Sequence, residues 1–309
     1  EPLLRCLCAN LRTTGRLGFR GERLEERTLQ EHGWRFYFDR EIVHCAPHFE
    51  AYLWACFIWA AARTGCPAFL DRTLVAIRHT MAAYPHGWRW TNGLQQERAR
   101  LLLPLAWLVR VRDTPEHRGW LACIADDLLA AQDACGALRE ELGPAGGGQF
   151  APPASNEDYG SAEAPLIQSD GDPLSDLLYT CNFAFLGLHE AAAATGESRF
   201  SAAADQLAQY LCRIQVRSEK HPALDGAWFR AFDFQRWDYW GSNADAGWGA
   251  WSIETGWTQA WILAVLALRE LRTSLWDLTA GTRVHERLPA VFATMLPPGR
   301  AAIQAAPST

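Results

Sequence analysis

Apolar residues recur along the chain with the spacing of helices that have one buried side. Residues 47–62 are apolar on nearly every face, whereas the apolar residues of 69–83 fall on a single stripe. The same couple, a more apolar segment and then a more polar one, returns at 97–110 and 116–132, at 175–193 and 199–214, and at 254–271 and 283–296. The pattern predicts buried inner helices, each followed by a solvent-facing outer helix.

Short turns separate the two members of a couple, and long connections separate one couple from the next. Gly65 and Gly196 follow threonines at the ends of two inner segments, and Pro115 begins an outer one. The long connections cover 84–96, 135–174 and 215–253. Because long loops in compact domains are usually functional, we expect a site at the N-terminal ends of the inner helices. No run alternates with a period of two over a useful length, so strands are not expected.

Repeated helical hairpins can stack as an open solenoid or close into a toroid. The repeats here differ in length, which argues against a regular solenoid. We therefore predict an all-α fold, an (α/α) toroid of helical hairpins that forms a single domain over residues 1–296. Residues 297–309 are expected to form a disordered tail.

Tryptophan is unusually frequent and unevenly placed. The chain has 15 tryptophans but only 7 tyrosines, and nearly half of the tryptophans lie between Trp228 and Trp261. Carboxylates and amides are interspersed with them, a combination that suits a sugar ring. The alternative is that these tryptophans fill a large core. The residues of this segment that are expected to contact sugar are Tyr239, Trp240, Asn243, Asp245, Trp248 and Trp257.

Net charge and cysteine content bear on the partners and the compartment. The formal net charge of −6 gives no basic footprint for nucleic acid, and no apolar run is long enough to span a bilayer. The nine cysteines are odd in number and include no CxxC pair, which favours free thiols in a reducing compartment. We therefore expect a cytoplasmic protein with a carbohydrate partner, and a periplasmic enzyme is the alternative.

Carboxylates stand at the starts of three inner segments. Glu97, Asp176 and Glu254 each open one, and a toroid would bring all three to one rim. Glu163 lies among small and apolar residues, where burial would raise its pKa and suit it to general acid catalysis. These four residues are the catalytic candidates, and most other acids of the connection before Asp176, such as Glu140, are expected to be solvated. The alternative for Glu97 is a first-turn acid favoured by the helix dipole.

Basic and polar residues near these acids are candidates to bind the substrate. They are His44, His48, Arg98, Tyr179, Asn182 and Arg230. The arginines and histidines are expected to hold a sugar carboxylate, for which a guanidinium fork is well shaped. The two histidines have no third ligand at a recognisable spacing, so no metal is predicted, and no nucleotide-binding motif indicates a cofactor.

The segment from Asp225 to Trp261 resembles a known group of enzymes. Residues 226–230 read Gly-Ala-Trp-Phe-Arg, and a Glu-Thr-Gly helix start follows at 254–256. This arrangement is similar to that of the six-hairpin, (α/α)6-toroid uronic-acid glycosidases, namely unsaturated glucuronyl hydrolases and the β-glucuronidases of glycoside hydrolase family 154. The resemblance implies a central site in which two carboxylates flank a sugar. A complete toroid of this kind has twelve helices and the sequence indicates about nine, so either an N-terminal hairpin is missing or the ring closes differently.

These observations lead to the hypothesis that the protein hydrolyses the glycoside of a terminal uronic acid with two carboxylates. Three alternatives stay open at this point. A polysaccharide lyase on the same toroid would use His48, Tyr179, Asn182 and Arg230. An epimerase would need a histidine pair, for which His48 and His189 are available. A non-catalytic carbohydrate-binding protein would need no acid at the helix starts.

Overall fold

The computed structural model describes residues 1–296 apart from 22, 156–163, 240–252 and 254–256. Helices make up most of the described structure. One continuous cluster of buried apolar side chains runs from Leu4 to Val291. Among the described residues, no helix is long and apolar enough to cross a membrane.

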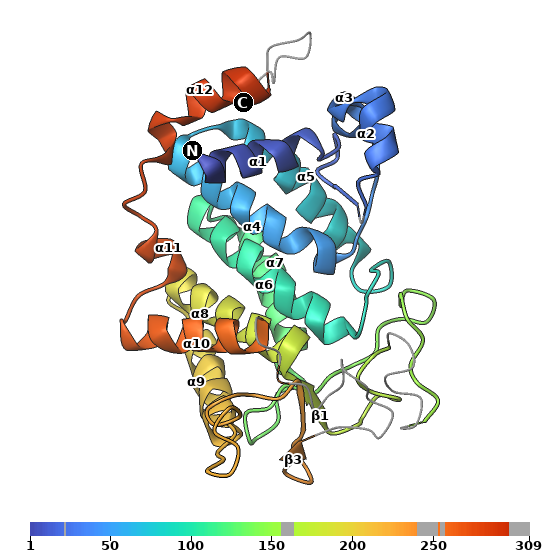
Figure 1. The fold of residues 1–309 in the computed structure, drawn as a ribbon, viewed down its shortest axis with the longest axis vertical. Coiled ribbons are helices and arrows are strands. Elements are labelled where there is room, and N and C mark those ends of the chain that lie inside the picture. Colours follow the sequence, from blue (N-terminus) through green and yellow to red (C-terminus); the bar gives the residue numbers. More distant parts are fainter. Residues whose placement is uncertain (22, 156–163, 240–252, 254–256, 297–309) are drawn as a thin grey trace.

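Four long helices form the interior and pack on one another in chain order (Figure 1). They are α4 (Pro47–Thr64), α6 (Leu94–Val111), α8 (Asn182–Thr195) and α10 (Trp257–Glu270). Helix α6 is the most enclosed of them, because every side chain from Leu94 to Val109 is buried. In Figure 1 each of the four begins at its right-hand end, and described parts of the connection 135–174 lie to the right of these starts. The structure therefore places long connections at the N-terminal ends of the inner helices, as predicted.

Each of the first three inner helices is covered by the outer helix that follows it. The outer helices are α5 (Pro67–Ala83), α7 (Pro115–Leu129) and α9 (Ser198–Arg213). The predicted turns are confirmed: Gly65 and Gly196 end α4 and α8 in the left-handed conformation, with φ of 68° and 72°. Thr114 caps α7 by accepting a hydrogen bond from the His117 amide at 3.1 Å.

The two ends of the described chain meet, and this changes the last predicted hairpin. Helix α12 (Leu288–Met295) packs on α1 (Pro2–Arg12), and the two lie side by side at the top of Figure 1. The segments 254–271 and 283–296 were expected to pair with each other, and that expectation is wrong. As a consequence α10 keeps an exposed apolar face, on which Leu263 is 62% exposed. The short helices α2 (Glu26–His32) and α3 (Trp34–Asp39) lie beside α1.

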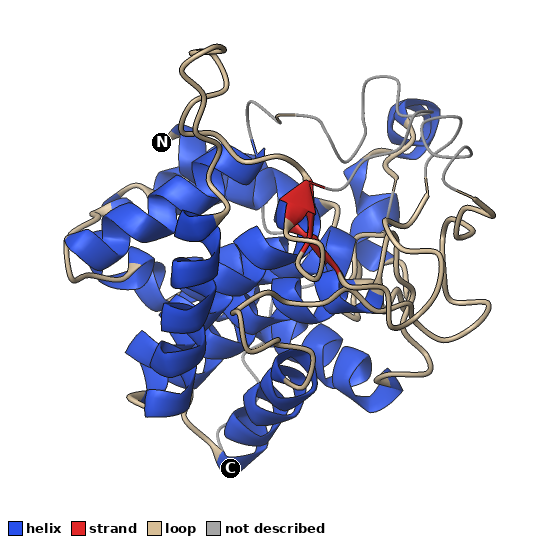
Figure 2. Ribbon diagram, turned by 90° about the horizontal axis from the view of Figure 1, so that it is seen from below, coloured by secondary structure: helices blue, strands red, loops and turns tan. Residues whose placement is uncertain are grey.

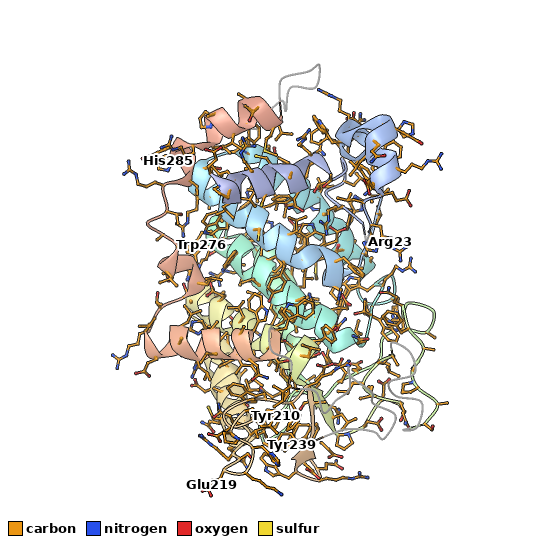
Figure 3. All side chains as sticks on the ribbon, in the orientation of Figure 1. Arg23, Tyr210, Glu219, Tyr239, Trp276 and His285 are labelled. Carbon is orange, nitrogen blue, oxygen red and sulfur yellow. The ribbon has the colours of Figure 1, made fainter. Side chains whose placement is uncertain are left out.

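The C-terminal ends of the inner helices are closed by α11 (Leu275–Leu278). Trp276 of this helix lies between two arginines, with Arg63 at 4.8 Å and Arg110 at 5.9 Å from its ring (Figure 3). The buried carboxylate of Glu190 accepts hydrogen bonds from the Trp107 indole at 2.7 Å and from the amides of α11 at 2.6 and 3.4 Å. Side chains of α4, α6 and α8 thus all hold α11 in place.

A small antiparallel sheet, which the sequence did not predict, packs against the segment that leads into α8. It consists of β1 (Leu174–Asp176), β2 (Ala231–Asp233) and β3 (Asp238–Tyr239), in that order. Figure 2 shows the strands in red beside the loops. Asp176 was expected to open the third inner helix, but it pairs with Ala231 at the end of β1 and caps the short π-helix η2 (Leu177–Cys181) that leads into α8. These strands are too short for an alternating pattern to reveal them.

Candidate active site

Four side chains, one from each inner helix, meet in the interior and form what we call the floor. They are Tyr52 of α4, Arg100 of α6, Phe183 of α8 and Trp261 of α10. The rings of Tyr52, Phe183 and Trp261 lie 5.0–5.5 Å apart, and the Arg100 guanidinium lies 4.1 Å from the Phe183 ring. The four inner helices therefore contact one another through these side chains.

A second set of four side chains, the rim, stands one helical turn closer to the N-terminal ends. It consists of His48, Glu97, Tyr179 and Trp257, each three or four residues before its floor counterpart. The Tyr179 ring lies 6.0 Å from His48 and 5.9 Å from Trp257. Glu97 accepts a hydrogen bond from the backbone amide of His48 at 2.5 Å. Since residues three and four apart share a helix face, the two layers are stacked.

Glu97 is the buried acid of the rim. Its side chain is fully buried, and it also accepts hydrogen bonds from the Gln96 amide group at 3.1 Å and the Thr91 backbone amide at 3.3 Å. Burial raises the pKa of Glu97 to about 7, although the nearby charge of Arg100 and these hydrogen bonds favour the ionised form. A carboxylic acid with such a pKa can donate a proton near neutral pH.

His48 is a neutral residue in this setting. Burial, helped by the charge of Arg100, lowers the pKa of His48 to about 3. Its Nδ1 atom is 3.0 Å from the Gln96 side-chain nitrogen and 3.1 Å from the Thr91 hydroxyl, which fix the orientation of the ring. The imidazole is thus available for hydrogen bonding rather than for charge pairing.

Asp176 holds the start of η2 and lies in the same charged neighbourhood. Its Oδ1 atom accepts hydrogen bonds from the amides of Leu178 and Tyr179, both at 2.8 Å. Burial raises the pKa of Asp176, while the positive charges of Arg230 and then Arg100 oppose the rise. The Arg230 guanidinium lies 5.5 Å from the Tyr179 ring. The structure therefore brings six predicted site residues to one place: His48, Glu97, Asp176, Tyr179, Arg230 and Trp257.

Glu140 is a buried acid that sequence reasoning placed in solvent, and that expectation is wrong. Its side chain is 2% exposed and accepts a hydrogen bond from the Thr180 hydroxyl at 2.5 Å. It also fills the space beside Gly93, where any larger residue would collide with it. Burial, together with the negative charge of Asp176, raises the pKa of Glu140 to about 8. The carboxyl connects the loop after α7 to the start of η2.

Replacing Glu140 by glutamine should make the protein more stable at alkaline pH. A folded-state pKa above the ordinary value of 4.5 means that the stabilising contribution is complete below about pH 4.5 and is lost as pH rises through about 8. Glutamine keeps the volume and an acceptor for Thr180 but cannot ionise. Melting curves at pH 5 and pH 8.5 should show the free energy of unfolding of E140Q rising relative to that of the wild type by about 3–4 kcal/mol between the two. An unchanged difference at both values would contradict the assignment.

Other predicted residues are held elsewhere. The Arg98 guanidinium donates to the Tyr84 hydroxyl at 2.7 Å and to Glu141 at 2.5 Å, on the side of the outer helices. His44 lies 3.5 Å from the buried carboxylate of Glu50. The structure does not bring Arg98 or His44 to the rim.

Asn182 and Tyr239 also take part in local structure. Asn182 is fully buried and its carbonyl accepts from the Phe183 amide at 2.7 Å. The Tyr239 hydroxyl donates to the Ile214 carbonyl at 2.9 Å, and its ring packs on Phe229, near Tyr210 at the lower end of Figure 3. The remaining predicted residues lie outside the described part of the chain: Glu163, Trp240, Asn243, Asp245, Trp248 and Glu254.

The tryptophans divide into core and rim. Trp54, Trp59 and Trp107 are buried on inner helices, as expected, and Trp228 is also core, with its indole donating to Leu211 at 2.8 Å. Trp257 is 51% exposed, which leaves one of its faces open to a ligand.

Arg100 and Tyr52 are the floor residues that the sequence analysis missed. Arg100 stands in the run Arg-Ala-Arg-Leu-Leu-Leu, three residues after Glu97. A spacing of three residues places Arg100 on the same helix face as Glu97, and this spacing is the signal by which the sequence could have indicated it. In the described residues, no group of three or more His, Cys, Asp or Glu side chains is arranged to hold a metal ion.

The helices define the class of the fold: the chain is an (α/α) toroid of helical hairpins, as predicted. No known protein family and no curated protein matches the chain in sequence. Among solved structures it is similar to an inactive variant of an α-1,6-mannanase of family GH76 from Salegentibacter sp. HEL1_6, in complex with α-1,6-mannotriose. The identity is 10% and the TM-score is 0.53, over 98% of this chain and 71% of the mannanase chain.

Two further solved structures show weaker likeness. One is the unsaturated glucuronyl hydrolase from Streptococcus agalactiae, with 13% identity and a TM-score of 0.47 over 83% of this chain. The other is a variant abbreviated UGL with the oligosaccharide dGlcA-Glc-Rha-Glc, with 16% identity and a TM-score of 0.45 over 78% of this chain. This chain spans 53% and 56% of their lengths. At these identities the likeness concerns the fold, and the assignment to family 154 stays a prediction.

Proposed function

We propose that the protein is a glycoside hydrolase that acts on a terminal uronic acid, with Glu97 as the general acid. The observation that carries the proposal is the protonatable, fully buried carboxyl of Glu97 between His48 and Arg100, at the open end of the inner helices. A shared fold with glycoside hydrolases supports the class of reaction but does not determine it.

The reaction would proceed by transfer of the Glu97 proton to the glycosidic oxygen as the bond from that oxygen to the sugar breaks. A second, ionised carboxylate would activate water or attack the sugar carbon directly. Asp176 is the described candidate for this role, because burial raises its pKa but the positive charges of Arg230 and Arg100 beside it oppose that rise. Glu163 and Glu254 are the other predicted candidates. The proton that Glu97 gives up is regained from water at the end of the cycle.

The aromatic side chains of the rim support a sugar as the ligand. Tyr179 and Trp257 meet edge to face at 5.9 Å, and half of the Trp257 surface is exposed. Indole and phenol rings bind the apolar faces of pyranoses, while neutral His48 can hydrogen-bond a hydroxyl. The positive charges of Arg100 and Arg230, close to these rim side chains, favour an acidic sugar over a neutral one as the ligand.

A panel of aryl glycosides tests the proposal. Nitrophenyl glucuronides in both anomeric forms, with the matching glucosides and mannosides, are incubated with the purified protein at pH 6. We expect release of nitrophenol from a glucuronide and little from the neutral sugars. Cleavage of neutral sugars alone would overturn the uronic acid part of the proposal. An unsaturated product from a polyuronide would indicate a lyase, and binding without turnover would indicate a binding protein.

The epimerase alternative receives no support from the geometry. His189 lies near the C-terminal end of α8, where its Nε2 atom is 2.9 Å from the Thr273 carbonyl beside α11. His48 is at the N-terminal end of α4. The two histidines are therefore at opposite ends of the inner helices, and they do not form a pair of bases.

A further inference from the structure

Two side chains of the floor, one buried and one half-buried, carry buried hydrogen-bond donors without partners in the described part of the chain. They are the Nε and Nη2 atoms of Arg100 and the hydroxyl of Tyr52. Arg100 is 7% exposed, and its one hydrogen bond goes from Nη1 to the His48 carbonyl at 3.3 Å. Unsatisfied buried donors are costly, and a buried guanidinium is especially so, because it has also lost its hydration. Such an arrangement is typical of a site that a ligand completes.

The position of Arg100 is consistent with that interpretation. Arg100 forms no ion pair with a described carboxylate, although Glu97 is one turn away on the same helix face and its charge favours the charged guanidinium. Tyr52 and Arg100 both pack on Phe183, with the Tyr52 ring centroid 5.0 Å and the Arg100 guanidinium 4.1 Å from the centroid of that ring. Both donor-bearing side chains therefore contact the same ring, one helical turn from the rim residues His48 and Glu97.

We propose that Arg100 and Tyr52 form the receptor for the carboxylate of the sugar bound at the rim, and that Arg100 sets the preference for acidic over neutral sugars. This inference rests on the proposed function for the identity of the ligand. The planar guanidinium offers parallel donors to a carboxylate, and the Tyr52 hydroxyl adds another. Arg98 and His44, which the sequence analysis assigned to this task, are already bonded to Tyr84, Glu141 and Glu50.

Calorimetric binding measurements test the receptor without requiring turnover. D-glucuronate, D-glucose and inorganic phosphate are titrated into the wild type and into R100Q and R100M. The same titrations with Y52F test the second donor, the Tyr52 hydroxyl. We expect the wild type to bind glucuronate about 10- to 100-fold more tightly than glucose, as hydrogen bonds to charged groups allow. R100Q and R100M should reduce that ratio to about threefold or less while the affinity for glucose is kept.

Arg110→Gln is the matched control, because Arg110 is an arginine on the same helix at the closed end. It should keep the full preference for glucuronate. An equal preference in wild type and R100Q would overturn the proposal, as would a wild type that binds glucose as well as glucuronate. Binding of phosphate but not of glucuronate would overturn it too, and would identify an inorganic anion site. If R100Q and R100M do not fold, the proposal is still tested by the ratio of the wild-type affinities for glucuronate and glucose and by the affinity of Y52F for glucuronate.

The outcomes for the receptor and for the proposed function are separable. A protein that binds glucuronate through Arg100 but cleaves no glycoside would retain the receptor and refute the hydrolase. A protein that cleaves only neutral glycosides would retain the hydrolase and refute the receptor.

Discussion

The variant E97Q is expected to lose about 10²–10⁴-fold in kcat/KM at pH 6, which is the typical contribution of a general acid. Glutamine preserves the volume of the side chain and can still accept the hydrogen bond from the His48 amide, so the rim should stay in place. Glutamine, however, has no carboxyl proton to give to the leaving oxygen. Initial rates with an aryl uronide that the wild type cleaves give the measurement.

E140Q is the matched control for this experiment. Glu140 is also fully buried and also has a raised pKa, but it contacts Thr180 behind the start of α6 rather than the rim. At pH 6 both carboxyls are protonated, so E140Q should retain wild-type activity within about threefold. Equal losses in the two variants would mean that burial, not catalysis, accounts for the effect of E97Q.

The pH profile of the wild type follows from the same group. The general acid must be protonated, and the pKa of Glu97 is about 7. The rate should therefore be high below about pH 7 and fall tenfold for each unit above it, until another group takes over. A rate that is flat between pH 6 and pH 9 would exclude Glu97 as the acid.

Replacing Glu190 by alanine is expected to be the most destabilising change among those considered. Its buried carboxylate accepts from Trp107 and from the amides of Leu275 and Trp276. Removing it leaves these donors unsatisfied, and we expect the free energy of unfolding to fall by about 2–4 kcal/mol. Chemical denaturation followed by tryptophan fluorescence gives the value.

E190Q provides the comparison, because glutamine keeps the volume and one acceptor oxygen. It should lose less than half as much stability as E190A. Both variants should keep kcat/KM per folded molecule, since Glu190 is far from the rim. A loss below about 0.5 kcal/mol in E190A would show that α11 does not depend on this carboxylate.

The helices could be predicted from sequence because their signals are local. The apolar stripes and the turns at Gly65, Thr114 and Gly196 depend on neighbouring residues alone, and they place α4 to α7 and α9 within a few residues of their observed ends, whereas α8 begins at Asn182 rather than at the predicted residue 175. The pairing of α12 with α1 could not be predicted in this way, because it joins residues that are far apart along the chain and leaves no periodic mark.

The candidate site was predictable to the level of its rim. His48, Glu97, Tyr179 and Trp257 come together because each stands in the first turns of an inner helix or just before one. Arg100 and Glu140 were missed for a common reason. Sequence reasoning assigns charged side chains to solvent, and only tertiary structure shows which of them are enclosed by other helices. Arg98 shows the reverse error, since a residue adjacent to Glu97 points to another face of the helix.

The closed C-terminal end of the inner helices limits how a ligand can enter and leave the site. Because α11 and the apolar core close the far end of the inner helices, a polysaccharide could not be threaded past the rim, and in the proposed hydrolase the released sugar would leave by the route through which the substrate arrives. In an enzyme built this way each turnover ends with the product in the path of the next substrate. Its release, rather than bond cleavage, can then limit the rate, and accumulated monosaccharide would compete with the polymer end.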